Sequence, residues 1–184
     1  MSASTIGRPG VFPAIDARTI TTLIVAGAFA TIAFDLFGQF ISPLLKEVLS
    51  PYFGAKLAPV GLANGVIAKI TGLPAGKLGL GHGLHVIAGL IAYPVGYLFV
   101  ARPLARAVFP SFPWWLLGAL YGAVLWVFAL YFMAHLIAGN PPFLVRTMDD
   151  GGWAFQSITW VALWGHMVFG IVAAGVIWWR EENT

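Results

Sequence analysis

The chain has 184 residues, of which 59% are hydrophobic and 9% are charged, and its formal net charge at pH 7 is +3. A typical soluble domain has about 25% charged residues, so this chain has too few charges to cover a water-soluble surface. The small positive charge gives no reason to expect a nucleic-acid partner. The absence of cysteine excludes disulfides, thiolate metal sites and cysteine-ligated iron–sulfur clusters.

Most of the hydrophobic residues fall in four long segments, at about residues 20–45, 80–104, 114–138 and 158–179. A helix rises about 1.5 Å per residue, so a segment of about 20 apolar residues crosses a hydrocarbon core of ~30 Å. The crossings and their connections use nearly the whole chain, so residues 1–184 are predicted to form a single transmembrane domain. The sequence therefore predicts an all-α integral membrane protein, an up-down bundle of four transmembrane helices.

The segment before the first helix is polar and lacks the short apolar core of a signal peptide. We expect the first helix to act as an uncleaved insertion signal and to end near Ser42-Pro43, because proline cannot donate a helical hydrogen bond. The connection that follows contains an apolar stretch with spaced lysines at residues 57–70. This pattern predicts a short helix lying in the membrane interface, with a re-entrant segment as the alternative.

Later in the chain, Pro94 predicts a kink in the second helix. Three prolines in residues 101–113 predict a tight turn at the membrane surface. The third connection, residues 139–156, has paired prolines, aspartates and glycines, which predict an exposed loop. Tryptophan pairs at Trp114-Trp115 and Trp178-Trp179 are typical of the aromatic belt at one membrane face.

Positively charged residues close to helix ends favour the cytoplasmic side of a membrane. The N-terminal segment, the second connection and the C-terminal segment are short and contain Arg8, Arg18, Arg102, Arg106 and Arg180. The first and third connections contain equally many positive residues, spread over longer segments. We therefore expect both termini on the cytoplasmic side.

Several polar residues of the predicted helices fall at similar depths near the membrane face opposite the termini. They are Asp35 and Gln39 in the first helix, and the histidines His82, His85, His135 and His166. Ionisable groups inside a bilayer are costly, so a convergent set of them predicts a functional site.

Imidazole groups bind zinc, copper, iron and nickel, and a carboxylate can complete the ligand set. The predicted metal ligands are His85, His135, His166 and Asp35, with Gln39, His82 and Tyr131 around them. The alternative is a single b-type haem held by two of His85, His166 and His135. Each residue also has a structural interpretation: His82 is hydrated, His135 bonds to loop carbonyls, and Asp35 pairs with a histidine without a metal.

The predicted helices contain the segments GHGLHVIAGLIAYPVGYL, GALYGAVLWVFALYFMAHLIAG and WGHMVFGIVAAGVIWW. These segments resemble small, largely uncharacterised four-helix inner-membrane proteins of proteobacteria. The shared features are an early histidine in the second helix, Gly118-x3-Gly122 in the third and Gly-His at the start of the fourth. The resemblance covers about residues 20–180 and implies a four-helix fold and the bacterial inner (cytoplasmic) membrane; it implies no activity.

These features lead to a first functional hypothesis: the protein binds a transition metal or a haem near one membrane face and is associated with a membrane redox system. The alternative is a non-catalytic accessory or assembly subunit of a larger respiratory or photosynthetic complex, in which the histidines only hold the bundle together. A small transporter or proton pathway through Asp35 is the third hypothesis. We expect the lipid bilayer and other membrane proteins as partners, and the sequence does not decide whether the protein is an enzyme.

Overall fold

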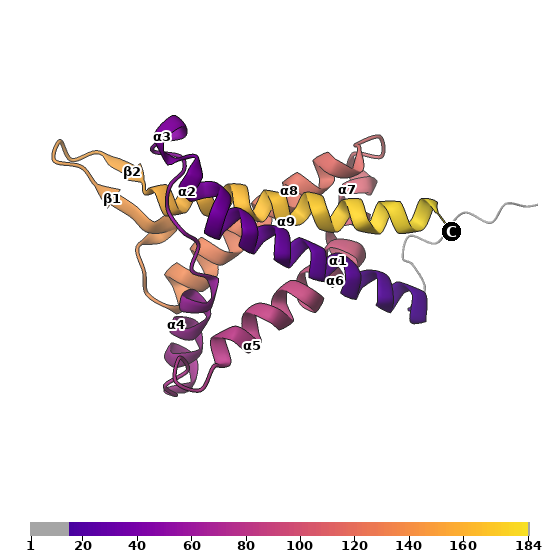
Figure 1. The fold of residues 1–184 in the computed structure, drawn as a ribbon, viewed down its shortest axis with the longest axis horizontal. Helices are drawn as coiled ribbons and strands as arrows, with labels where there is room; N and C mark the ends of the chain where they lie inside the picture. The colour runs from indigo at the N-terminus through magenta and orange to yellow at the C-terminus, as the bar shows by residue number, and fades with distance from the viewer. Residues whose placement is uncertain (1–14, 184) are drawn as a thin grey trace, which may run out of the picture.

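A computed structural model describes residues 15–183 of the chain (Figure 1). Arg8 and most of the polar N-terminal segment lie outside the described residues. Within residues 15–183, the helices long and apolar enough to cross a membrane are Ala17–Leu44, Leu80–Val108, Trp114–Ile137 and Ser157–Glu182. Their ends lie within four residues of the predicted ones. The prediction of an α-helical, multi-pass membrane protein is confirmed at this level.

The first two spans are each built from several consecutive helical segments. The first consists of α1 (Ala17–Leu36), the π-helical η1 (Phe37–Ile41) and α2 (Ser42–Leu44), and the short α3 (Lys46–Leu49) follows it. The second consists of α5 (Leu80–Ile87), η2 (Ala88–Ala92), α6 (Tyr93–Gly96), η3 (Tyr97–Ala101) and α7 (Arg102–Val108), of which η2 and η3 are π-helical.

Between these two spans, α4 (Pro59–Thr71) covers most of the predicted stretch 57–70. Figure 1 shows α4 steeply inclined to α9 (Ser157–Glu182), at the end of the bundle far from the C-terminus. It packs against α5 and against the end of the third span. The chain therefore has a short helix where the sequence predicts one.

The third span consists of α8 (Trp114–Val127) and the π-helical η4 (Phe128–Ile137). The connection after it, predicted as an exposed loop, contains a short 3-10 helix (Pro142–Leu144) and a hairpin of β1 (Val145–Thr147) and β2 (Trp153–Phe155). The strands are antiparallel, with Val145 opposite Phe155.

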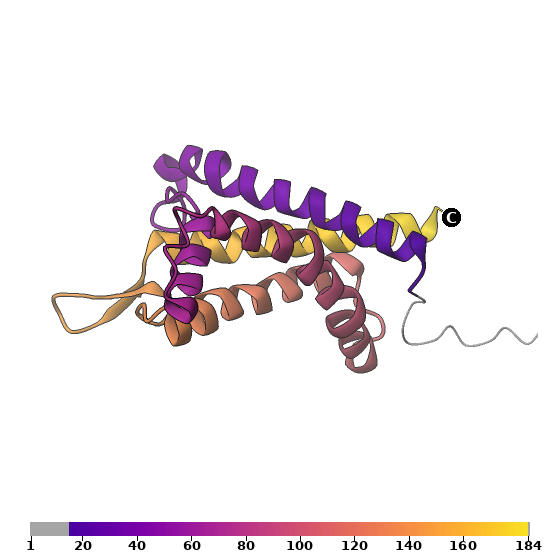
Figure 2. The ribbon, with the colours of Figure 1, turned by 90° about the horizontal axis from the view of Figure 1, so that it is seen from below.

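A π-helical segment comes two residues before each proline inside the first two spans. η1 ends at Ile41 before Pro43, η2 at Ala92 before Pro94, and η3 at Ala101 before Pro103. Proline lacks an N–H group and crowds the carbonyl group four residues earlier, and the wider π-helical turn relieves this conflict. The second span has two such places and bends, as Figure 2 shows for the magenta helix.

The prediction of a tight turn in residues 101–113 is wrong for its first part, because α7 continues the helix to Val108. Pro103 occupies the second position of α7. A proline in the first turn of a helix interrupts no hydrogen bond of that segment, so it does not end the span.

α9 lies at the centre of the bundle, with α8 and α1 packed along it. Glycines allow the closest approaches: a Cβ atom at Gly122 of α8 would overlap the carbonyl oxygen of His166, and one at Gly118 would overlap that of Gly170. Small residues at these positions let helix backbones approach closely, which is how helices associate in membranes.

Polar side chains connect the helix ends near the two termini. The guanidinium of Arg18 donates to the carbonyl oxygen of Arg180 over 3.1 Å. Arg102 forms a two-bonded ion pair with Glu181, with N–O distances of 2.6 and 2.7 Å. Nearby, the rings of Trp114 and Trp178 stack at 5.5 Å, so these tryptophans of the predicted aromatic belt lie together.

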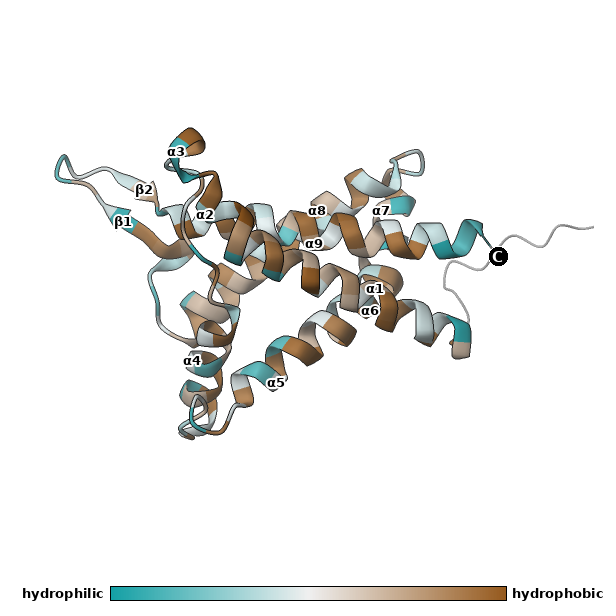
Figure 3. Cartoon of the chain, viewed as in Figure 1, coloured by the Kyte–Doolittle hydropathy of each residue, from teal (hydrophilic) through white to brown (hydrophobic). Residues whose placement is uncertain are grey.

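Large apolar side chains are exposed along the spans. Figure 3 shows many brown, hydrophobic residues along the ribbons of these helices. Phe29, Phe40 and Val124 are examples of such exposed side chains. Surfaces of this kind are stable against lipid tails, in agreement with bilayer association.

Candidate functional site

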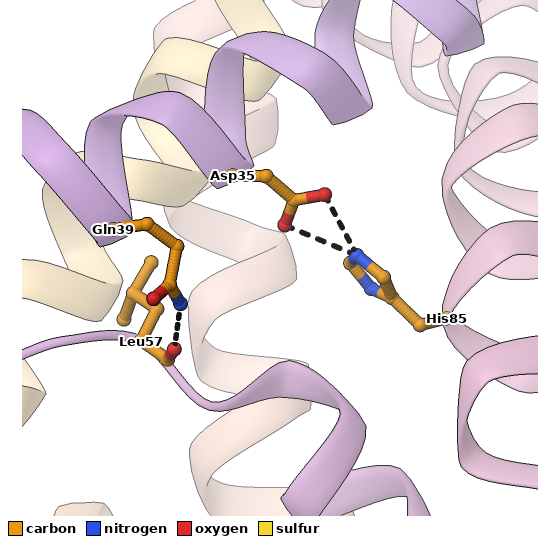
Figure 4. A network of polar contacts seen from close by, with 4 residues as sticks. All are labelled: Asp35, Gln39, Leu57 and His85. Carbon is orange, nitrogen blue, oxygen red and sulfur yellow. Dashed lines mark hydrogen bonds and ion pairs between the residues drawn. The ribbon is translucent and has the colours of Figure 1, made fainter. Parts of the chain in front are cut away.

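His85 of α5 and Asp35 of α1 form a hydrogen-bonded pair between the first two spans (Figure 4). Nε2 of His85 lies 3.1 Å from Oδ1 and 3.2 Å from Oδ2 of Asp35. The two helices approach closely because Gly89, one turn after His85, packs directly on Thr31, one turn before Asp35. The side chain of His85 is 18% exposed and that of Asp35 is 43% exposed. The pair therefore extends from the interior of the bundle, at His85, towards its surface, at Asp35.

Gln39 lies one turn after Asp35, but its side chain points elsewhere, as Figure 4 shows. Its amide donates to the carbonyl oxygen of Leu57, in the extended segment between α3 and α4. The hydroxyl of Ser42 bonds to the same segment, accepting from Gly54 N–H over 3.1 Å and donating to the carbonyl of Ala55 over 2.9 Å. Gln39 therefore fixes a connection and does not contact the histidine.

His166 lies on α9 with 9% of its surface exposed. Its Nδ1 is 2.7 Å from the carbonyl oxygen of Ala162, one turn earlier in the same helix. The ring of Phe34 stands edge-on to it, at a centroid distance of 5.1 Å, and lies 6.3 Å from the ring of His85. Phe34 is therefore an aromatic neighbour of both imidazoles.

The remaining predicted residues lie apart from His85 and His166. Nδ1 of His135 donates to the carbonyl of Asn140 over 2.7 Å, which matches the structural interpretation of that histidine. Tyr131 packs its ring against His135 at 5.5 Å, and His82 is exposed in the first turn of α5. His135, Tyr131 and His82 do not line the cavity beside His85 and His166.

Among residues 15–183, no three histidine, aspartate or glutamate side chains lie close enough together to hold one metal ion. The structure pairs Asp35 with His85 and leaves His135 in a helix-end contact, so the predicted ligand set is not gathered in one place. The metal or haem hypothesis stays a prediction.

A cavity of about 340 Å³ lies between the spans and α4, and both His85 and His166 line it. Its wall is mostly apolar, with aromatic side chains from Phe34, Tyr93 and Phe169. Binding sites for small molecules have this character, with volumes of about 300–1,000 Å³ and a few polar groups among apolar ones.

Thr31 also lines the cavity, and its hydroxyl is buried without a hydrogen-bond partner among the described residues. Sequence reasoning did not select Thr31 or Phe34 as site residues. The signal for Thr31 was its spacing of four residues from Asp35, which places both on one face of a helix. Phe34 gave no such signal, because one phenylalanine among many apolar residues has no distinguishing pattern.

No known protein family, curated protein or solved structure matches the chain. The resemblance to proteobacterial four-helix proteins therefore stays a prediction.

Proposed function

We propose that this protein binds a small, mostly apolar molecule with a polar group in the cavity between its membrane spans. The observation that supports this proposal is the cavity of about 340 Å³ with His85, His166 and Thr31 on an otherwise apolar wall. Buried polar groups need hydrogen-bond partners, and Nε2 of His166 has none among residues 15–183. A bound polar group would supply such a partner.

We further propose that the spans cross a bacterial inner membrane in alternating directions, with both termini in the cytoplasm. Support comes from Arg18 and Arg102, which contact Arg180 and Glu181 at one end of the bundle, as expected for the positive side. In this arrangement α4 lies in the opposite interface, with its Lys69 exposed in the last turn.

The metal or haem hypothesis would now depend on His85 and His166, the two histidines that line the cavity. Its test is an absorption spectrum of the purified protein, with elemental analysis of the same sample. A haem band or a metal in near-equal amount to protein would support it. The accessory-subunit hypothesis also stays a prediction, because lipid alone accounts for the apolar outer faces.

Photolabelling with benzophenone tests the proposed ligand site, because this small aromatic ketone attaches to nearby C–H groups and reacts readily with methionine. Met133 lines the cavity and gives a place to detect it by mass spectrometry. We expect labelling at Met133 to fall several-fold in Ala88→Phe, whose added ring would occupy the cavity that Ala88 lines.

Ala92→Phe is the matched control, since Ala92 lies one turn later on the same span, is exposed and does not line the cavity. Thermal unfolding should show that both variants fold. Labelling of Met133 that is unchanged in Ala88→Phe, or that is spread evenly over lipid-facing residues, would overturn the proposal.

A further inference from the structure

The hydrogen bond of His166 determines which of its ring nitrogens holds the proton. A carbonyl oxygen can only accept, so Nδ1 of His166, 2.7 Å from the carbonyl of Ala162, is the N–H nitrogen. A charged imidazole is costly inside a bilayer, so the ring is neutral and Nε2 has an unshared electron pair. Nε2 has no hydrogen-bond partner within the described part of the chain. His166 thus supplies a hydrogen-bond acceptor at the cavity.

His85 is engaged differently. Its Nε2 lies 3.1 and 3.2 Å from the two oxygens of Asp35, so this nitrogen already has a partner in the protein. Of the two histidines that line the cavity, His166 is therefore the one that the inference uses as the acceptor.

The shape of the wall favours a flat ligand. Phe34 neighbours both imidazoles, with ring distances of 5.1 Å to His166 and 6.3 Å to His85. The rings of Tyr93 and Phe169, also on the wall, meet at nearly a right angle at 5.7 Å. Aromatic rings prefer edge-to-face or offset neighbours, so such a wall accommodates another aromatic ring.

We propose that the ligand is an aromatic alcohol, a phenol or a hydroquinone, which donates its hydroxyl hydrogen to Nε2 of His166 and packs its ring near Phe34. This inference rests on the proposed function and names the ligand class for the same cavity. An ether oxygen has no hydrogen to donate, so an ether of the same shape leaves Nε2 of His166 without a partner.

A matched ligand pair tests this class with the native protein. The chain in phosphatidylcholine nanodiscs is titrated, under reducing conditions, with tert-butylhydroquinone and with its dimethyl ether, and empty nanodiscs correct for partition into lipid. We expect the hydroquinone to bind at least tenfold more tightly, which corresponds to about 1.4 kcal/mol.

The variant His166→Phe keeps an aromatic ring and removes the acceptor, so the affinity ratio between the two ligands should fall to near one. His82→Phe is the control, because His82 is exposed and does not line the cavity; it should keep the ratio.

A second measurement does not depend on any variant. The chain has four histidines, so the ¹⁵N spectrum of histidine-labelled protein can be assigned residue by residue. We expect a protonated Nδ1 and an unprotonated Nε2 in His166, and a shift of the Nε2 signal when hydroquinone is added. The reversed tautomer would overturn the inference.

The outcomes separate the two proposals. Equal binding of hydroquinone and ether, abolished for both by Ala88→Phe, would overturn the aromatic-alcohol inference and leave the cavity as a binding site. Benzophenone labelling that depends on the cavity, without any hydroquinone binding, would do the same. If hydroquinone and ether do not bind and benzophenone does not label the cavity, the proposed function is overturned as well.

Discussion

Asp35 and His85, which lie on two different membrane spans, are within hydrogen-bond distance of each other. Both carboxylate oxygens face Nε2 of the imidazole, at 3.1 and 3.2 Å. An unpaired carboxylate in a bilayer costs at least ~2.5–3.5 kcal/mol on insertion scales. The pairing reduces this cost for Asp35 and fixes the orientation of the His85 ring at the cavity.

We expect Asp35→Ala to lower the free energy of unfolding by about 1–3 kcal/mol, because the hydrogen bond between the two spans is lost and Nε2 of His85 is left without its partner. Equilibrium unfolding in mixed detergent micelles measures this change. The same substitution in a His85→Ala background should cost much less. An equal loss in both backgrounds would contradict the pairing, and Asp149→Ala, in the exposed hairpin, is the control.

Among the elements, α8 and α9 depend on backbone contact at glycines. A Cβ atom at Gly122 would overlap the carbonyl oxygen of His166, which cannot move without shifting the helix. We expect Gly122→Ala to destabilise the protein by about 1–3 kcal/mol, the usual cost of overpacking. Gly83→Ala is the matched control, since a Cβ atom there meets nothing within 4 Å. Thermal unfolding of both variants in detergent measures the difference; equal unfolding temperatures would refute the close contact.

The start of α1 gives a prediction about pH. Asp16 caps this helix by accepting a hydrogen bond from Thr19 N–H over 2.7 Å, and this backbone hydrogen bond, helped by the Thr19 side chain, holds the pKa of Asp16 below its ordinary value of 3.8. A pKa that is lowered by folding adds stability above 3.8, and this stability disappears as the pH falls through the lowered pKa.

Unfolding of the native chain and of Asp16→Asn should therefore be compared above and below pH 3.8. Asparagine caps a helix without titrating, so the native chain should lose more stability on acidification than the variant. Parallel losses in the two proteins would contradict the role of this carboxylate.

The spans were predictable from the sequence because about 20 apolar residues have one stable location, the bilayer. The pairing of Asp35 with a histidine was among the sequence interpretations, and Asp35 does meet His85. The direction in which each helical residue faces was not predictable. A π-helical turn holds more residues than an α-helical one, so every π-helical segment rotates the residues after it about the helix axis. His135 lies within η4, where the 3.6-residue periodicity fails, and it contacts Asn140 and not the cavity.

For the whole molecule, the proposed arrangement requires the hairpin and the C-terminal end of α9 to lie on opposite sides of the membrane. The chain has no cysteine, so single cysteines can report on each side. We expect a membrane-impermeant maleimide to label Asp150→Cys on intact spheroplasts and Asn183→Cys only after permeabilisation. The reversed pattern would mean that the termini face outward, and labelling of both on intact cells would contradict alternating crossings.

The position of Phe34 has a consequence for any movement of protons through the bundle. Its ring stands beside both imidazoles, at 5.1 Å from His166 and 6.3 Å from His85, and a benzene ring can neither take up nor release a proton. Phe34 therefore could not pass a proton from His85, the partner of Asp35, to His166. A molecule in the cavity whose hydroxyl groups contact both histidines would connect them, so any proton movement between them would depend on whether the cavity is occupied.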